Sequence, residues 1–224
     1  VKNAIVSKEV DGYYISLVIE QITEKKHFDP KSNNQAVGLD IGVNLFYALS
    51  NGQIKENPRI LKSFESELRI AQRALARKIK RSNNWYKQVE NIKKIHLKIK
   101  RIRQDFSQKA STQLIENFSQ IVVENLKLKN MTKSSKGDQE NHGKMVKQKS
   151  GLNRVILDVG IGGFFRQLEY KSKWYDREFV KVDPKYTSQT CNICGHKSKE
   201  NRKTQAKFEC VNCGHKENAD VNAA

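Results

Sequence analysis

The sequence is poor in cysteine, proline and acidic residues, and it contains no long apolar run. Its 224 residues include four cysteines and three prolines, and 24 Asp or Glu stand against 42 Lys or Arg. No apolar stretch approaches the roughly 20 residues that cross a bilayer, and the first residues do not form an export signal. We therefore expect a cytosolic protein with one main core and at most a small satellite module.

The shortage of acids leaves a formal net charge of +18 at pH 7. A field of this size attracts polyanions, and nucleic acid is the commonest partner of such a protein. A merely solvated basic surface, as in a ribosomal or membrane-surface protein, stays open as an alternative on composition alone.

The first 60 residues alternate between strand-like runs and turn signals. Residues 5–19 are rich in Val, Ile and Tyr around Asp11-Gly12, which predicts an antiparallel hairpin. The polar stretch 23–34 resembles a linker, with a boundary near residue 35. A meander of three strands is expected from Ala36 onward, and its first strand ends on Asp40 between Gly38 and Gly42, where the backbone can approach a ligand closely.

A basic helical hairpin is predicted over residues 61–118. Apolar residues recur there at steps of three and four, from Leu61 to Ile79 and again from Trp85 to Phe106. Residues 61–110 carry 15 Lys or Arg against 4 Asp or Glu, a net charge of +11. A coiled-coil face that is merely solvated usually balances its charges, so we interpret this hairpin as a cradle for a phosphate backbone. Candidate phosphate contacts are Arg73, Arg77 and Arg81.

A buried strand, a polar loop and a broken helix are expected next. The strand covers residues 120–126 and carries Glu124, an acid that an apolar strand rarely tolerates without a partner or an ion. Residues 130–150 predict a mobile loop, residues 151–175 a helix that Gly160, Gly162 and Gly163 divide in two, and residues 178–182 another strand. Lys149 and Arg154 are candidate phosphate contacts. The expected core positions of the helix are Leu152, Val155, Ile156, Phe164, Phe165, Leu168 and Trp174.

The cysteines form two Cys-x2-Cys pairs, Cys191 with Cys194 and Cys210 with Cys213, separated by fifteen residues. This spacing is typical of a four-thiolate zinc ribbon, whereas iron and a redox dithiol are less frequent alternatives. Four sulfurs leave no open coordination position, so the ribbon is expected to be structural or to grip nucleic acid. His196 and His215 follow the two pairs and are interpreted as residues outside the ligand set.

The segment between the last strand and the ribbon, Thr187-Ser188-Gln189, offers hydroxyl and amide groups. Ser188 and Gln189 are candidate hydrogen-bond donors to DNA or to a guide duplex, and a plain capping role is an equal alternative.

Three isolated acids, Asp40, Glu124 and Asp220, occupy a strand end, a later strand end and the start of a terminal helix. Each alone has an ordinary explanation, such as a turn aspartate or an acid at a helix N-terminus. Together they can supply converging carboxylates for two magnesium ions about 4 Å apart, because Mg2+ prefers an octahedron of hard oxygen ligands.

Six ordered motifs make the sequence resemble the TnpB family of transposon-encoded proteins and its relatives, the compact type V CRISPR effectors. The motifs are GLDIGV, IVVENL, KQKSGLNR, KVDPKYTSQTCNICG, FECVNCGH and NADVNAA, and the resemblance covers the whole chain. It implies an α/β fold with an RNase H-like, RuvC-type mixed sheet, the basic hairpin and an inserted zinc ribbon. Asn218 stands where many relatives carry another aspartate.

The resemblance also implies an arrangement of domains and an activity. Residues 1–34 would end a wedge barrel and its linker, 35–186 would form the RuvC-like core, 187–217 the zinc ribbon, and 218–224 the start of the last RuvC segment. A longer amino-terminal region is normal in the family, so we expect this chain to be either a natural fragment or part of a longer protein.

The implied function is RNA-guided DNA cleavage with guide RNA and target DNA as partners, in the bacterial cytoplasm at the nucleoid. Asp40, Glu124 and Asp220 would be the catalytic acids and magnesium ligands, and the four cysteines the ligands of a structural zinc. Alternatives are an RNA-guided DNA binder without nuclease activity, a transposition accessory protein, and a simple zinc-ribbon DNA-binding protein.

Overall fold

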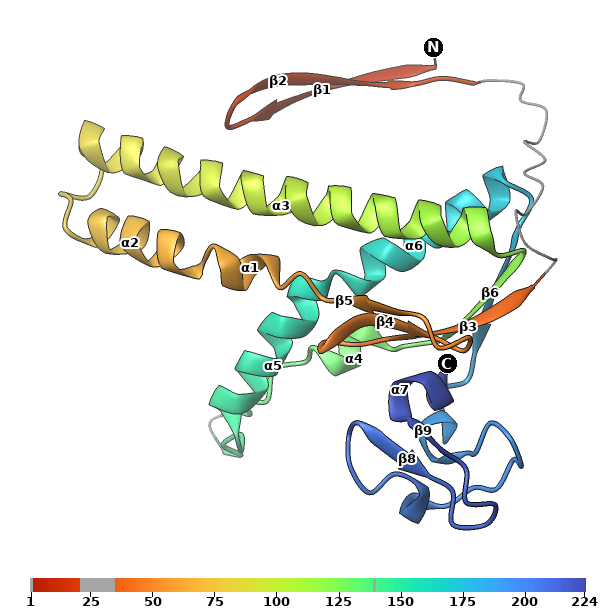
Figure 1. Cartoon of the computed structure of the whole chain (residues 1–224). Helices are drawn as coiled ribbons and strands as arrows, with labels where there is room; N and C mark the ends of the chain where they lie inside the picture. The colour runs from red at the N-terminus through yellow and green to blue at the C-terminus, as the bar shows by residue number, and fades with distance from the viewer. Residues whose placement is uncertain (1, 21–34, 139) are drawn as a thin grey trace. The chain divides into compact units, whose positions relative to one another are not determined.

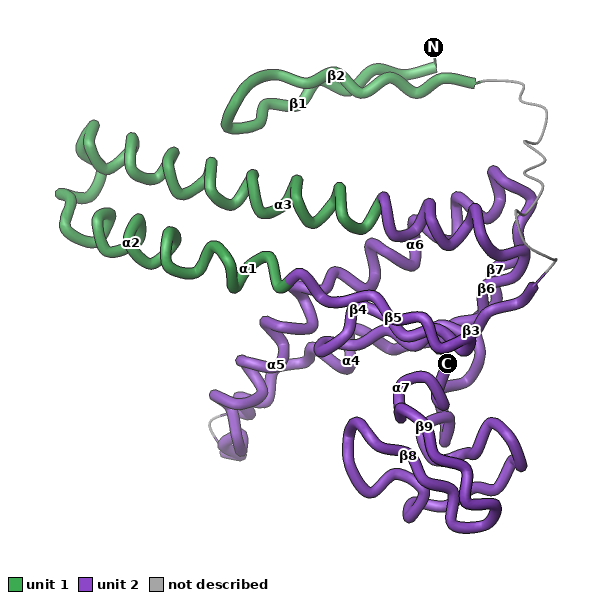
Figure 2. Tube along the Cα trace, in the orientation of Figure 1, with its two compact units in different colours: residues 1–26, 59–108 green, residues 27–58, 109–224 purple. Residues whose placement is uncertain are grey.

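The computed structural model describes residues 2–20, 35–138 and 140–224. The chain divides into two compact units (Figure 2). One contains the described parts of Val1–Lys26 and Arg59–Gln108, and the other contains those of His27–Pro58 and Lys109–Ala224. The linker predicted over residues 23–34 lies outside the described residues. In the described parts of the chain, no helix combines the length and the apolar character needed to cross a membrane.

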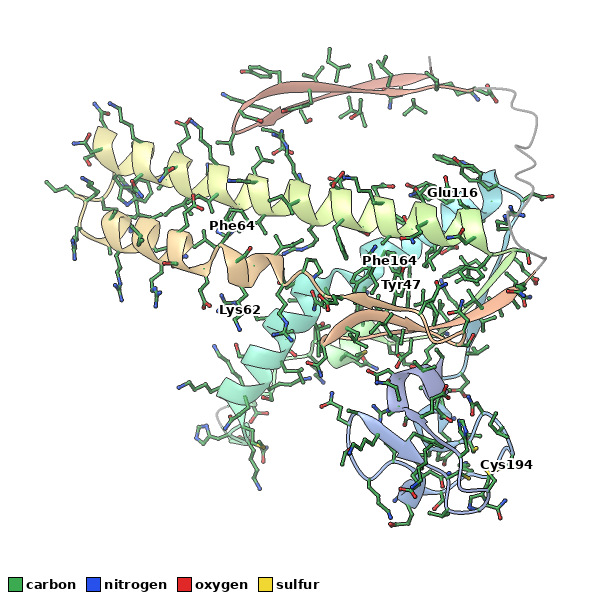
Figure 3. All side chains as sticks on the ribbon, in the orientation of Figure 1. Tyr47, Lys62, Phe64, Glu116, Phe164 and Cys194 are labelled. Carbon is green, nitrogen blue, oxygen red and sulfur yellow. The ribbon has the colours of Figure 1, made fainter. Side chains whose placement is uncertain are left out.

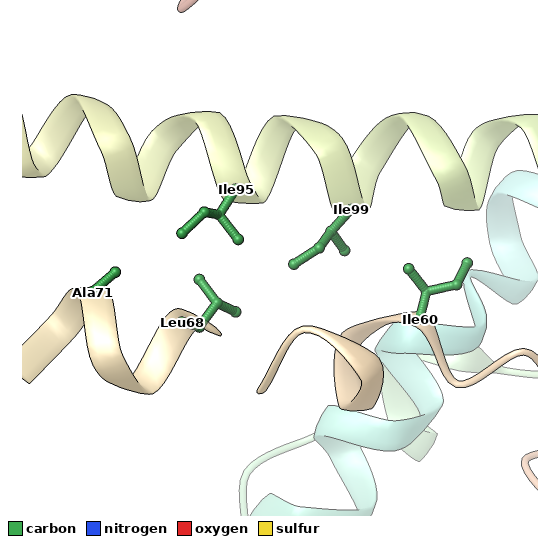
Figure 4. Packing of buried hydrophobic residues seen from close by; sticks show 5 residues of the cluster. All are labelled: Ile60, Leu68, Ala71, Ile95 and Ile99. Carbon is green, nitrogen blue, oxygen red and sulfur yellow. The ribbon is translucent and has the colours of Figure 1, made fainter. Parts of the chain in front are cut away.

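The first unit contains the predicted strand hairpin and most of the predicted helical hairpin. Strands β1 (Asn3–Glu9) and β2 (Gly12–Val18) pair antiparallel around the Asp11-Gly12 turn. Helices α1 (Ile60–Ser63) and α2 (Glu65–Ala76) pack against α3 (Asn83–Asn117), which continues into the second unit. Their shared core is made by apolar residues three or four positions apart, as Figure 4 shows for Ile60, Leu68, Ala71, Ile95 and Ile99.

The predicted apolar seam is wrong at the turn of the helical hairpin. Ile79 is 82% exposed because α2 already ends at Ala76. The periodic pattern continued by chance into the connection between the two helices.

The second unit is built on a mixed five-stranded sheet in the order β5-β4-β3-β6-β7. The expected meander consists of β3 (Ala36–Ile41), β4 (Leu45–Leu49) and β5 (Ile54–Glu56), paired antiparallel. Strand β6 (Gln120–Glu124) lies parallel to β3, and β7 (Glu178–Val182) lies parallel to β6. An α/β fold with a mixed sheet is therefore confirmed.

The two faces of the sheet carry different helices. On one face Phe164 of α6 (Ile161–Trp174) packs against two aromatic residues of β4, with ring centroids 4.8 Å from Phe46 and 6.2 Å from Tyr47 (Figure 3). Val37 and Leu39 of β3 are buried, and they alternate along the strand with Gly38 and Asp40. A short terminal helix, α7 (Ala219–Ala223), contacts β3 and β4 and lies next to the C-terminus (Figure 1).

The segment between β6 and β7 corrects one prediction and confirms another. After α4 (Leu128–Met131) the chain makes an isolated bridge between Gly137 and His142, and helix α5 (Val146–Val159) begins within the stretch predicted to be loop up to residue 150. Residues 146–150 contain a single apolar side chain, so periodicity gave no helical signal there. The predicted division of the helix is confirmed, because α5 ends at Val159 and α6 begins after Gly160.

The predicted core of these helices is right in α6 except at Trp174, and it is mostly wrong in α5. Ile156, Phe164, Phe165 and Leu168 are buried. Leu152, Val155 and Trp174 are instead 46%, 43% and 65% exposed, because only a narrow stripe of each helix faces the sheet.

Candidate active site

Asp40 and Glu124 lie at the carboxyl ends of adjacent parallel strands, Asp40 as the second-to-last residue of β3 and Glu124 as the last residue of β6. Leu39 of β3 pairs with Val123 of β6, so the two acids follow this pair side by side. Leu39 and Val123 are both buried, and side chains alternate along a strand. The carboxylates of Asp40 and Glu124 therefore point to the same face, opposite the buried one.

Helix α7 brings the third acid to this face. Its first turn carries Asp220, and the side-chain oxygen of Asn218 accepts hydrogen bonds from the backbone N–H groups of Asp220 and Val221 at 2.9 and 3.4 Å. Asn218 is thus the N-cap that positions Asp220. The sequence predicted a helix start here but did not predict this role for Asn218.

Gly38 lets α7 approach the sheet. A Cβ atom at this position would lie 1.4 Å from the backbone oxygen of Ala224. The sequence suggested that glycines beside Asp40 make room for a ligand, whereas Gly38 makes room for the chain's own backbone at the end of α7.

The three acids act on each other electrostatically. Burial, together with the negative charges of Glu124 and Asp220, raises the pKa of Asp40 to about 7, while the positive charge of Arg202 acts in the opposite direction. Asp40 therefore interacts electrostatically with both Glu124 and Asp220.

Two neighbouring side chains, Thr187 and Arg202, orient Glu124 and Asp220. The hydroxyl of Thr187, in the short helix η1 (Thr187–Gln189), donates a hydrogen bond to a carboxylate oxygen of Glu124. A guanidinium nitrogen of Arg202 lies 3.1 Å from Asp220 Oδ1. The sequence predicted that Thr187 lies in a polar segment with two possible roles. No sequence pattern distinguished Arg202 from the other basic residues between Cys194 and Cys210.

The four cysteines converge as well. Sγ of Cys191 lies 3.7 Å from Sγ of Cys213, and Sγ of Cys194 lies 3.6 Å from Sγ of Cys210. Across residues 2–20, 35–138 and 140–224, this is the one group of three or more potential metal ligands whose donor atoms all lie within 4.8 Å of one another. Figure 3 labels Cys194 within this group. The cysteines are therefore able to bind a metal ion.

The two Cys-x2-Cys pairs have the same backbone conformation. The N–H of Cys191 donates to the carbonyl of His196, and the N–H of Cys210 donates to that of His215, at 3.0 and 2.8 Å. Gly195 and Gly214 follow the pairs with φ values of 69° and 72°, a left-handed conformation that glycine adopts without strain. The N–H of His196 also points at the sulfur of Cys194, which lowers the pKa of this thiol to about 6.

A buried amide holds the cysteine segment together. Asn201, which is 0% exposed, ends the short helix η2 (Lys199–Asn201) and donates to the carbonyls of Gln189 and His196 at 2.9 and 3.0 Å. It accepts a hydrogen bond from the N–H of Val211 at 3.0 Å. One side chain thus links the two cysteine pairs.

A second amide joins the cysteine segment to α7. Asn222 donates to the carbonyl of Thr190 at 2.9 Å and accepts from the N–H of Asn192 at 3.2 Å. Strands β8 (Lys207–Glu209) and β9 (Lys216–Asn218) pair antiparallel and lead directly into α7. The cysteine segment and the helix of Asp220 are therefore one connected piece.

The predicted nucleic-acid contacts are spread over several elements. Arg73 and Arg77 are exposed on α2 and at its C-cap, and Arg81 is exposed in the turn before α3. Arg154 is exposed on α5, whereas the ammonium of Lys149 donates to the carbonyl of Met131. Ser188 and Gln189 are half-buried in η1 beside Thr187. Their contact with nucleic acid stays a prediction.

A family model described as "Probable transposase", OrfB_IS605, matches residues 16–135, which is more than half of the chain. The chain belongs to the OrfB_IS605 family. A second model, "Cas12f1-like, TNB domain", matches residues 162–224, which contain α6, β7, the cysteines and α7. The resemblance to the TnpB family carried by the ordered motifs is thereby confirmed.

Members of the OrfB_IS605 family and related proteins extend the match. "Putative RNA-guided DNA endonuclease InsQ" of Escherichia coli K12 is 43% identical over all of this chain and 55% of its own length. A "Putative RNA-guided DNA endonuclease" of Streptomyces pristinaespiralis is 30% identical over 98% of this chain and 50% of its own. The chain spans about half the length of these curated relatives.

A solved structure supports the fold. The structure titled "Cryo-EM structure of the Cas12f1-sgRNA-target DNA complex" aligns with 98% of this chain and 54% of its own, with a TM-score of 0.53 and 22% identity. At this identity the similarity concerns the fold alone.

Proposed function

We propose that this chain carries the nuclease centre of a TnpB-type RNA-guided DNA endonuclease. The observation that carries the proposal is the meeting of Asp40, Glu124 and Asp220, from three separate elements, on one face of the sheet. Acids from distant parts of a chain repel each other, and such a cluster is stabilised when cations bind it.

The sheet supports an RNase H-like, RuvC-type core. An antiparallel meander is followed by two strands parallel to its first strand, and the acids occur at the carboxyl ends of β3 and β6. In this proposal residues 35–186 form the core with the basic hairpin 61–118, residues 187–217 the zinc ribbon, and residues 218–224 the last RuvC segment. Residues 1–34 end the preceding wedge module.

The acid cluster suits two divalent ions better than one. Among the described residues, no three carboxylates have oxygens that all lie within 4.8 Å of one another. Two ions about 4 Å apart, each about 2.1 Å from its oxygen ligands, allow a wider spread. Asp40 interacts electrostatically with both other acids. It is therefore the residue that would bridge the two magnesium ions, while Glu124 and Asp220 would each hold one.

Bound magnesium would activate a water for in-line attack on a DNA phosphodiester and stabilise the attacking and leaving oxygens. The chain's own residues prepare the site. Thr187 fixes one oxygen of Glu124, Asn218 fixes the backbone that carries Asp220, and Arg202 balances part of the negative charge at Asp220. These contacts hold the acids in place before the substrate arrives.

The metal of the cysteine group is proposed to be structural zinc. A tetrahedral site with Zn–S bonds of about 2.3 Å has sulfurs about 3.8 Å apart, close to the separations of 3.6 and 3.7 Å seen here. Four thiolates complete the tetrahedron, so this ion would hold the segment of Asp220 and take no part in hydrolysis.

Guide RNA and target DNA are the proposed partners. Relatives named RNA-guided DNA endonucleases and the net charge of +18 support this assignment. A bacterial protein with these partners would act at the nucleoid.

The test is cleavage of a target plasmid with Mg2+ and co-purified RNA, by the full-length protein that contains this chain. We expect the unchanged protein to cut and Asp40→Ala to be inactive, because the acid that interacts with both of the others is lost. Asp183→Ala is the matched control. This exposed acid follows β7 at the same edge of the sheet, and the control protein should cut normally.

Equal cutting by Asp40→Ala and by the unchanged protein would refute the nuclease assignment. RNA-dependent binding without cutting by the unchanged protein would favour the alternative, an RNA-guided binder or transposition accessory protein.

A further inference from the structure

A groove lies between helix α6 and the edge strand β7, on the face of the sheet that α6 covers. It consists of two hollows of about 220 and 310 Å³ that share Glu169 and Lys181. Glu124 lines the smaller hollow at the carboxyl end of β6. The groove thus begins at the same edge of the sheet as the acids, on the face opposite their carboxylates, and follows α6 away from that edge.

The larger hollow has the chemistry of a phosphate site. It is lined by three basic residues, Lys173, Arg177 and Lys181, and by the hydroxyl of Ser172. Ser172 is 2% exposed, and within the described residues its Oγ has no hydrogen-bond partner. A buried hydroxyl without a partner is rare in proteins, so this one favours a ligand that supplies the missing oxygen or donor.

The floor of the groove is aromatic. Phe165 lines the smaller hollow and Phe179 the larger one, with ring centroids 6.3 Å apart. The ammonium of Lys181 lies 5.4 Å from the ring centroid of Phe179. Aromatic rings beside basic side chains form the platform on which single-stranded nucleic acids stack their bases.

An ion pair crosses the groove where the hollows join. Lys181 Nζ lies 3.3 Å from a carboxylate oxygen of Glu169, and both side chains are about half exposed. A phosphate that enters here can take the place of Glu169 at Lys181, because a half-exposed pair is weak in water.

We propose that this groove binds the single strand of DNA that leads to or from the phosphate to be cut. The proposal rests on the proposed function, since it assigns the groove to the substrate of the acid cluster. Phosphates contact Lys173, Arg177, Lys181 and Ser172, and a base lies against Phe165 or Phe179. A guide RNA strand in the same groove is the rival that the experiment separates.

The experiment measures binding of fluorescent oligo-dT to the full-length protein without added Mg2+, where no cleavage can occur. Lys181→Gln should weaken binding several-fold. It should also reduce the slope of the logarithm of the binding constant against the logarithm of the salt concentration by about 0.7, the value of one phosphate contact on a single strand. Glu169→Gln should tighten binding several-fold, because Lys181 then has no competitor.

Ser172→Ala separates binding from folding. We expect weaker binding of oligo-dT with an unchanged or higher thermal unfolding midpoint, because the hydroxyl makes no hydrogen bond within the described residues. If Ser172 were purely structural, Ser172→Ala would lower the thermal unfolding midpoint and leave oligo-dT binding unchanged.

The ion pair between Glu209 and Lys216, 2.9 Å apart on β8 and β9, provides matched control variants. Glu209→Gln and Lys216→Gln make the same charge changes away from the groove. If they alter oligo-dT binding as much as the changes at 169 and 181 do, the groove is no specific site. Cross-linking of iodouracil-substituted oligonucleotides should map to Phe165 or Phe179, and cross-links elsewhere would overturn the proposal.

Further results separate the groove from its rival and from the proposed function. Tight binding of oligo-rU with weak binding of oligo-dT would overturn the DNA assignment. If Asp40→Ala abolishes cutting while the groove variants bind normally, the groove proposal alone fails. If Asp40→Ala cuts normally while the groove variants change binding, the acid cluster is not the nuclease centre and the groove remains a nucleic-acid site.

Discussion

Asp40 shows how a single residue can be costly to the fold and still be retained. Its carboxyl group is held among two other acids, and its pKa is raised from 3.8 to about 7. Between these two pH values the folded protein binds a proton that the unfolded chain releases, so stability falls as pH rises through this window. Above pH 7 the carboxyl group of Asp40 is ionised in the folded protein as well, and its burial beside two other acids then destabilises the fold most.

Asp40→Asn should therefore stabilise the metal-free protein at pH 8 by about 2–4 kcal/mol, the energy of a shift of this size. The gain should shrink toward zero near pH 4, where Asp40 is protonated in both states. Urea unfolding at several pH values without added Mg2+ measures it, and a gain independent of pH would contradict the raised pKa. Added Mg2+ should stabilise the unchanged protein more than Asp40→Asn.

The meeting of Asp40 with two other acids could be predicted from the sequence, but the residues that surround them could not. The acid ends an apolar strand between glycines, a local pattern that is visible in the residues themselves. The contacts of Thr187 with Glu124 and of Arg202 with Asp220 join residues 63 and 18 positions apart. No periodicity or spacing encodes such pairs, because they arise only when the sheet and α7 are assembled.

At the scale of elements, α7 depends on the sheet on one side and on the cysteine segment on the other. Gly38 makes the first contact possible and Asn222 makes the second. The sequence predicted a helix start at Asp220 and a four-sulfur cluster, but their physical connection became apparent only in the structure.

Gly38→Ala should displace the end of α7, because the added carbon would overlap the backbone of Ala224. We expect a loss of about 1–3 kcal/mol of stability and a strong loss of plasmid cleavage. Gly151→Ala is the control, since a Cβ at this position of α5 meets nothing within 4 Å and alanine favours helix. Equal effects of the two changes in unfolding and cleavage assays would contradict the close approach of α7.

Removal of metal from the cysteines should loosen α7 before it loosens the sheet. Chelation, or Cys191→Ser, should speed amide exchange in residues 207–223 while β3 and β6 stay protected, because Asn222 ties α7 to the first cysteine pair. Mass spectrometry of hydrogen exchange measures both regions. Unchanged exchange in α7 would mean that the cysteine segment does not support it.

At the scale of the whole molecule, charge was the most reliable signal in the sequence and the least specific. The excess of 18 positive charges predicts a polyanionic partner, but it does not say which element meets which strand. Periodicity predicted the long helical pair well, because its apolar seam is regular. It failed at the exposed face of α5, where apolar side chains do not face the sheet.

The basic hairpin should dominate the salt dependence of duplex binding. Replacing Arg73, Arg77 and Arg81 together by Gln should lower the slope of the logarithm of the binding constant against the logarithm of the salt concentration by about 2–3. The reason is that each phosphate contact on duplex DNA contributes about 0.9 to this slope. The control replaces three exposed lysines of the cysteine segment, Lys199, Lys203 and Lys207. Equal slopes for both triple variants in binding titrations would show that the hairpin has no special role.

The matching backbones of the two cysteine pairs have a practical consequence for mutagenesis. The two pairs share a backbone conformation, yet their middle residues make different contacts. The Asn192 amide of the first pair donates to Glu217 at 2.9 Å, whereas the Asn212 amide of the second pair donates to the sulfur of Cys194 at 3.9 Å. Copying the middle residues of either pair onto the other should therefore remove a contact, although the backbone of both pairs is the same.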